Sequence, residues 1–127
     1  MGGIRPRVDT RSKILTLAAA LELRPPVAIV SGYFDVLRAE DARDLGRVRH
    51  HPLLVIVLPL ANEILSQRAR AELVAALRVV DYVVTADDAY VERLVVGLRP
   101  VEFVRLEAAH GRRASELMEH VHRRQAS

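Results

Sequence analysis

The most informative segment of this chain is Gly32–Asp41, with the sequence GYFDVLRAED. It follows the short apolar run Val27–Val30 and leads into a segment with the spacing of a helix. A strand, a glycine turn and a helix N-terminus, in that order, present backbone N–H groups and a partial positive charge to an anion. The pattern therefore predicts an anion-binding turn after the first strand.

Apolar runs alternate with amphipathic segments along the rest of the chain. The predicted strands are residues 27–30, 53–58, 82–84 and 101–106. The predicted helices run from Thr10 or Ser12 to Leu21, from Asp35 or Leu37 to Val48, from Ser66 through Val79, from Asp87 or Asp88 to Gly97, and from Ser115 onward. Strands separated by helices imply a parallel sheet with right-handed crossovers. We therefore expect an α/β, Rossmann-like three-layer fold with a parallel sheet of four to five strands.

Length and composition narrow the possible classes of protein. A chain of 127 residues that is 50% hydrophobic favours one domain, expected over residues 10–127 after a flexible tail of residues 1–9. The net charge of +3 is carried by arginines interspersed with carboxylates, and aromatics are scarce, so no nucleic-acid partner is expected. The longest apolar run, Leu53–Ala61, contains Pro59 and is far shorter than a membrane span. A cytoplasmic protein without a membrane partner is the expectation.

The residues of the opening stretch resemble the signature G-x-F-D-x-x-H-x-G-H of the cytidylyltransferase-like nucleotidyltransferases. Gly32, Phe34 and Asp35 match the first half of that signature. Arg38 and Asp41 stand where the family carries its two histidines, and Glu40 replaces the glycine between them.

Three further segments carry the same resemblance. Residues 13–17 are similar to the lead-in of the nucleotidyltransferase half of bifunctional heptose-phosphate enzymes, and residues 67–84 resemble the family's QR…L…AL…VD-V block. Residues 99–105 resemble the segment P-D-x-x-V-K-G-x-D-Y, with Arg105 at the lysine. The resemblance covers roughly Ser12 to Arg105, but the family's final strand and its S-T-T motif have no counterpart.

The resemblance implies an enzyme that couples a nucleoside triphosphate to a sugar phosphate or alcohol phosphate and releases pyrophosphate. In the family, the histidine pair stabilises charge on the triphosphate in the transition state. Glu40 and Asp41 instead place two carboxylates where the polyanion would lie. We therefore favour a relative that has lost catalysis and serves as a nucleotide- or phosphate-binding or structural partner. The alternative is an active nucleotidyltransferase.

No catalytic residue, metal ligand or cofactor is assigned, and Mg²⁺ with nucleotide is expected only under the active alternative. The resemblance also implies a homodimer. The candidate residues for binding a nucleotide or another phosphorylated small molecule are Gly32, Tyr33, Phe34, Asp35, Arg38, Asp41, Arg68 and Arg105.

Each of these residues also has a purely structural interpretation. Gly32 can serve only a tight turn, Phe34 only the core, and Asp35 only the cap of the following helix. Arg38, Glu40 and Asp41 can form the solvated face of a helix, on which Arg38 and Asp41 have the i,i+3 spacing of a weak ion pair. Arg68 and Arg70 are either surface arginines or phosphate ligands.

Overall fold

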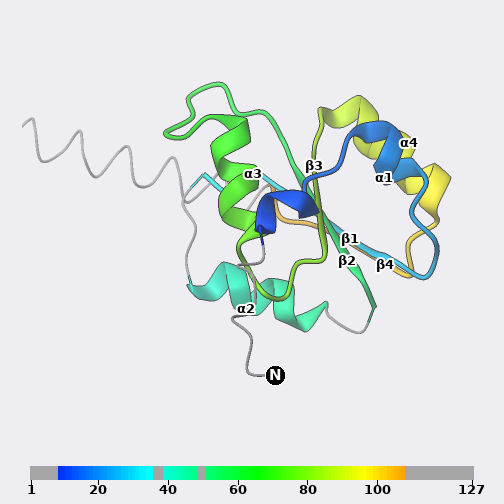
Figure 1. The fold of residues 1–127 in the computed structure, drawn as a ribbon. Coiled ribbons are helices and arrows are strands. Elements are labelled where there is room, and N and C mark those ends of the chain that lie inside the picture. Colours follow the sequence, from blue (N-terminus) through cyan, green and yellow to red (C-terminus); the bar gives the residue numbers. More distant parts are fainter. Residues whose placement is uncertain (1–8, 36–38, 49–50, 108–127) are drawn as a thin grey trace, which may run out of the picture.

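The computed structural model describes residues 9–35, 39–48 and 51–107 of the chain (Figure 1). Its strands are β1 (Ala28–Gly32), β2 (Leu53–Val57), β3 (Tyr82–Thr85) and β4 (Glu102–Arg105). They form one four-stranded sheet in the order β3-β2-β1-β4, and every neighbouring pair is parallel. The predicted α/β, Rossmann-like class is confirmed. The expected last helix from Ser115 lies outside the described residues, as does the expected tail up to residue 8.

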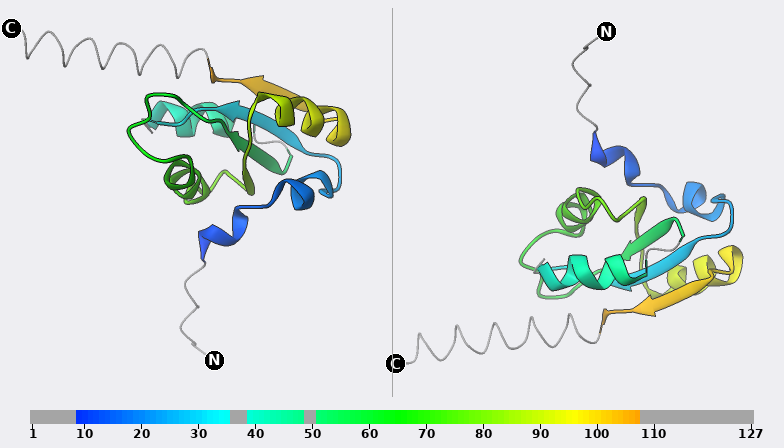
Figure 2. Two further views of the ribbon diagram at one scale, coloured as in Figure 1. Left: turned by 90° about the horizontal axis from the view of Figure 1, so that it is seen from above. Right: turned by 90° about the horizontal axis from the view of Figure 1, so that it is seen from below.

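The order in which strands are added to the sheet reverses between β1 and β4, although all strands run parallel. The chain steps outward from β1 to β2 and β3, and it then returns to pair β4 with the free side of β1. Val30 pairs with Val55 on one side and with Val104 on the other. In both views of Figure 2, β4 forms the outer margin of the sheet.

Helices cover both faces of this sheet. Both faces of the central strands are therefore buried, which explains why their sequences are almost continuously apolar. One face carries α2 (Ala39–Arg47) and α3 (Gln67–Ala75), and the other carries α1 (Leu17–Leu21) and α4 (Asp88–Leu98). Alternate residues of β2 serve the two cores: Leu53 and Val55 face α2 and α3, whereas Leu54 and Ile56 face α1 and α4. The result is the three-layer arrangement visible in Figure 1.

The prediction of one continuous first helix is wrong. Residues 10–21 form the 3₁₀ helix η1 (Thr10–Lys13) and the separate α1, whose N-caps are Asp9 and Thr16. Between them the backbone is extended, because Ile14 forms a bridge with Val83 and the Leu15 N–H donates to the Val83 carbonyl at 2.7 Å. Pairing with the sheet overrides the helical spacing of the apolar residues.

The prediction that α4 ends at Gly97 is also wrong, by one residue, and Gly97 has a role in packing instead. The helix continues to Leu98, and Arg99 adopts the left-handed conformation of the C-cap with φ of 47°. A Cβ on Gly97 would lie 3.2 Å from Leu21 Cδ2. This glycine therefore allows α4 to approach α1 closely, and it does not end the helix.

Candidate functional site

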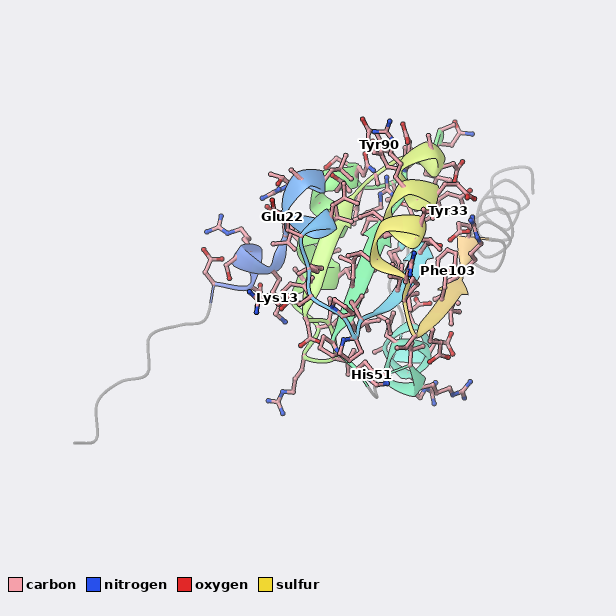
Figure 3. All side chains as sticks on the ribbon, turned by 90° about the vertical axis from the view of Figure 1, so that its right-hand side faces the viewer. Lys13, Glu22, Tyr33, His51, Tyr90 and Phe103 are labelled. Atoms are coloured by element: carbon pink, nitrogen blue, oxygen red, sulfur yellow. The ribbon has the colours of Figure 1, made fainter. Side chains whose placement is uncertain are left out.

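The strand order places the candidate site at the carboxyl ends of β1 and β4. In open α/β sheets, ligands bind at that edge where the strand order reverses. The segment after β1 begins at Tyr33, and Leu106 and Glu107 follow β4. The Leu106 N–H donates to the Ser31 carbonyl at 2.8 Å, which holds the two strand ends together. Figure 3 labels Tyr33 at this edge and Phe103 on β4.

Gly32 does not make the turn itself. It is the last residue of β1, is buried, and accepts a 2.9 Å hydrogen bond from the Leu58 N–H at its carbonyl. The left-handed residue is Phe34, with φ of 53°. Phe34 is 1% exposed and belongs to the core beneath α2 and α3. A bulky residue in this conformation is strained, so the surrounding packing fixes the turn.

Asp35 ties this turn to the loop that follows β2. Its side chain is almost fully buried, and its carboxylate accepts hydrogen bonds from the N–H groups of Ile64, at 3.0 Å, and Leu65, at 3.1 Å. Buried backbone N–H groups need such partners, because an unpaired one is costly. The Asp35 carboxylate therefore has a structural role on the loop of residues 59–66, which the sequence did not reveal.

Arg70 occupies the centre of this edge and is fully buried on α3. Its Nη1 donates to the carbonyl oxygens of Tyr33 and Leu58, both at 2.7 Å, and its Nε donates to the Leu65 carbonyl at 3.1 Å. Its Nη2 pairs with the Glu63 carboxylate at 2.8 Å. The interpretation of Arg70 as a surface arginine is therefore wrong, and its guanidinium is engaged with groups of the chain itself.

The two other candidate arginines in the described part of the chain have carboxylate partners. Arg68 pairs with Glu72 at 3.4 Å on the exposed side of α3. Arg105 pairs with Glu92 at 3.4 Å and with Glu107 at 3.7 Å, and its guanidinium lies 5.0 Å from the centre of the Phe103 ring. A phosphate would have to compete with these carboxylates for either arginine.

Ser31 and Glu107 form a further polar contact at the same strand ends, and sequence reasoning missed it. Ser31 is fully buried in β1, and its hydroxyl donates to the Glu107 carboxylate. The two residues are 76 positions apart. No local pattern could have connected them, because only the pairing of β4 with β1 brings them together.

The substituted histidine positions are only partly described. Arg38 lies outside the described residues, as does the side chain of Glu40, so the predicted Arg38–Asp41 ion pair lies there too. Asp41 is on α2 and is fully buried. It is therefore not part of a solvated helix face.

Carboxylates follow every strand at this edge of the sheet. They are Asp35 after β1, Glu63 after β2, Asp87 and Asp88 after β3, and Glu107 after β4. Within residues 9–35, 39–48 and 51–107, no group of three or more carboxylate or histidine side chains could hold a metal ion. These carboxylates would repel a polyanion placed beside them.

The N-termini of α3 and α4 beside the edge are capped by side chains of the chain itself, whereas residues 36–38, which precede α2 and belong to the predicted anion-binding turn, lie outside the described residues. Ser66 accepts from the Ala69 N–H at the start of α3, and Asp87 accepts from the Tyr90 N–H at the start of α4, both at 3.1 Å. The Gln67 side-chain amide donates to the Val57 carbonyl at 2.9 Å. These groups are engaged within the chain, which reduces what an anion could gain there.

No protein-family model and no curated protein matches the chain. A solved structure with the same fold is the lipopolysaccharide core biosynthesis protein from Thermoplasma volcanium GSS1. The two are 17% identical, with a TM-score of 0.55, and the match covers 63% of this chain and 94% of that chain. At this identity the likeness is one of fold. In the described part of the chain, no helix has the length and apolar character needed to cross a bilayer.

Proposed function

We propose that this chain is a cytidylyltransferase-like protein that has lost nucleotidyl transfer and acts as a structural partner protein. The observation that carries the proposal is the set of contacts made by Arg70. Its buried guanidinium donates to the Tyr33 and Leu58 carbonyls and pairs with Glu63. A cation at the centre of the expected phosphate site is thus used to hold the site's own backbone.

The remaining polar groups support the same role. The Asp35 carboxylate is bonded to two backbone N–H groups, and Arg105 is paired with two carboxylates. Catalysis of phosphoryl and nucleotidyl transfer relies on preorganised positive charge aimed at the phosphates. In addition, Asp41 replaces the second histidine of the family's pair, so an acidic side chain stands where the family carries one that stabilises the phosphates.

Two observations favour the active alternative. The fold is shared with a lipopolysaccharide core biosynthesis protein, and Gly32, Phe34 and Asp35 match the first half of the nucleotidyltransferase signature. Under this alternative the chain transfers a nucleotidyl group to a sugar phosphate or alcohol phosphate, with Mg²⁺ bound to the triphosphate. Arg38 would then contact a phosphate, because guanidinium groups bind phosphates well.

A measurement of pyrophosphate release distinguishes the inactive protein that we propose from the active nucleotidyltransferase. The protein is incubated with each nucleoside triphosphate, Mg²⁺ and a panel of phosphorylated sugars and alcohols, with heat-denatured protein as background. We expect no release above that background. Release that depends on the acceptor and is abolished by Arg38→Ala would overturn the proposal in favour of the active alternative.

A further inference from the structure

The outer edge of β4 has no partner strand among the described residues. β4 pairs only with β1, and it is the last strand in the order β3-β2-β1-β4. A strand edge presents a row of backbone N–H and C=O groups that can pair with another strand. Natural proteins often protect such edges with charged residues or covering segments. The side chains beside the β4 edge therefore indicate whether another chain binds there.

Apolar side chains flank this edge on the α4 side. Val101, which immediately precedes β4, is 53% exposed, and Phe103 in β4 is only partly buried. Val96 on α4 is 73% exposed. It lies one turn from Glu92, which reaches Arg105 on β4, so Val96 is on the flank of α4 that faces β4. The largest exposed fraction among the big apolar residues of the described chain is thus beside the strand edge.

An apolar cavity lies beside the same edge of β4, on the side of α2. A cavity of about 290 Å³ lies between α2 and β4, and its apolar lining comes from Val30, Val48, Val104 and Leu106. Val104 and Leu106 are only partly buried, although both pack against the core beneath α2 and α3. An exposed apolar surface on both sides of an unpaired strand is typical of an interaction site.

The charges around β4 are of both signs and close together. Asp44, Arg47 and Glu102 line the cavity on the α2 side, and Glu92 and Arg105 lie on the α4 side. An interface between identical copies related by a two-fold axis must be complementary to itself. A surface with acidic and basic groups on each side meets this condition, whereas a surface of one sign repels a second copy.

We propose that β4 pairs antiparallel with β4 of a second copy of this chain, so that the two sheets form one continuous sheet. Opposite residues of neighbouring strands must point to the same face, so a residue on the two-fold axis faces itself. With Val104 on the axis, Phe103 lies opposite Arg105 of the second copy. Arg105 already stacks on Phe103 within one chain at 5.0 Å, and the dimer offers each guanidinium a second ring of the same kind.

Single-cysteine variants test this pairing sharply, because the chain contains no cysteine. In an antiparallel pair, opposite Cα atoms are about 4.5 to 5.5 Å apart, within the range that a disulfide spans. Val104→Cys should therefore give a covalent dimer on mild oxidation of the full chain. Ile64→Cys, at a residue 61% exposed on the loop after β2, is the matched control and should stay monomeric on a denaturing gel.

A second pair of variants does not depend on the chemistry of oxidation. Sedimentation velocity of the full chain should show a reversible dimer. Val101→Glu should weaken it at least about tenfold, because residue 101 lies opposite Glu107 of the second copy in this register and the two carboxylates repel each other. Ile64→Glu is the control and should leave dimerisation unchanged. A parent chain that is monomeric across the concentration series, a dimer unaffected by Val101→Glu, or equal cross-linking of Val104→Cys and Ile64→Cys would overturn the proposal.

Discussion

Arg70 Nη1 and the Tyr33 carbonyl oxygen are 2.7 Å apart, although the two residues are separated by 37 positions in the chain. This hydrogen bond joins α3 to the first residue after β1. The same nitrogen also reaches the Leu58 carbonyl, which follows β2. The carboxyl ends of two neighbouring strands are therefore held together by one buried cation.

Removing the Arg70 guanidinium should destabilise the fold severely. Arg70→Met keeps much of the side-chain volume but leaves the Tyr33, Leu58 and Leu65 carbonyls without this donor. We expect the free energy of unfolding to fall by about 3 kcal/mol or more. Arg68→Met, at an exposed site on the same helix, should change it by less than about 0.5 kcal/mol. Equal denaturation midpoints for the two variants would contradict this role of Arg70.

Removing the Asp35 carboxylate should loosen the loop after β2. Asp35→Ala takes away the acceptor of the Ile64 and Leu65 N–H groups, and we expect a loss of stability of about 1 to 3 kcal/mol. Amide hydrogen exchange at Ile64 and Leu65 should accelerate more than exchange in β2. Asp88→Ala, at an exposed residue of α4, is the control and should leave both amides protected. Unchanged exchange in Asp35→Ala would count against the assigned contact.

Ser66 should stabilise the start of α3 through its side chain. Its Oγ accepts from the Ala69 N–H at 3.1 Å, so Ser66→Ala should lower the free energy of unfolding by about 1 kcal/mol. Ser66→Asp retains an acceptor at the cap and should recover most of this loss. The comparison is made by chemical denaturation, and an Ala variant as stable as the Asp variant would exclude a capping role.

The contact between Asp9 and Arg11 should show in the titration of Asp9. Hydrogen bonds from the Arg11 side chain and backbone hold the pKa of the Asp9 carboxyl below its usual value. A depressed carboxyl pKa adds stability above the pKa of the unfolded chain, and this stability is lost as the pH falls through the folded pKa. NMR titration should therefore give a low midpoint for Asp9, and Arg11→Gln should raise it. An identical midpoint in the variant would be the contrary result.

The strand segments and their parallel pairing were predictable from the sequence, because buried parallel strands carry a strong local signal, whereas the strand order was not predicted. Leu53–Val57 is apolar throughout, and the segments between the strands have helical spacing. Ser66 and Asp87 are residue types typical of an N-cap, so the starts of α3 and α4 were also predictable from the local sequence. The break after Lys13 was not predictable, because the pairing of Ile14 with Val83 depends on where β3 lies.

The polar contacts of the site were much less predictable than the fold. The GYFD segment predicted a site at the carboxyl ends of the strands, and the segment lies there because it follows the first strand. The partners of Arg70 and the pairing of Ser31 with Glu107 depend on chain segments that meet only in the folded state. An arginine in an amphipathic helix looks the same in sequence whether it faces solvent or a set of buried carbonyls.

The most direct test of the central claim is a calorimetric titration of the full chain with nucleoside triphosphates in the presence of Mg²⁺. Because Arg70 and Arg105 at the carboxyl edge are bound to the chain's own carbonyls and carboxylates, we predict no saturable binding at concentrations up to about 1 mM, the upper end of ordinary KM values. Saturable micromolar binding that pyrophosphate displaces and Arg105→Ala weakens would show that the edge accepts a polyanion, and it would contradict the account.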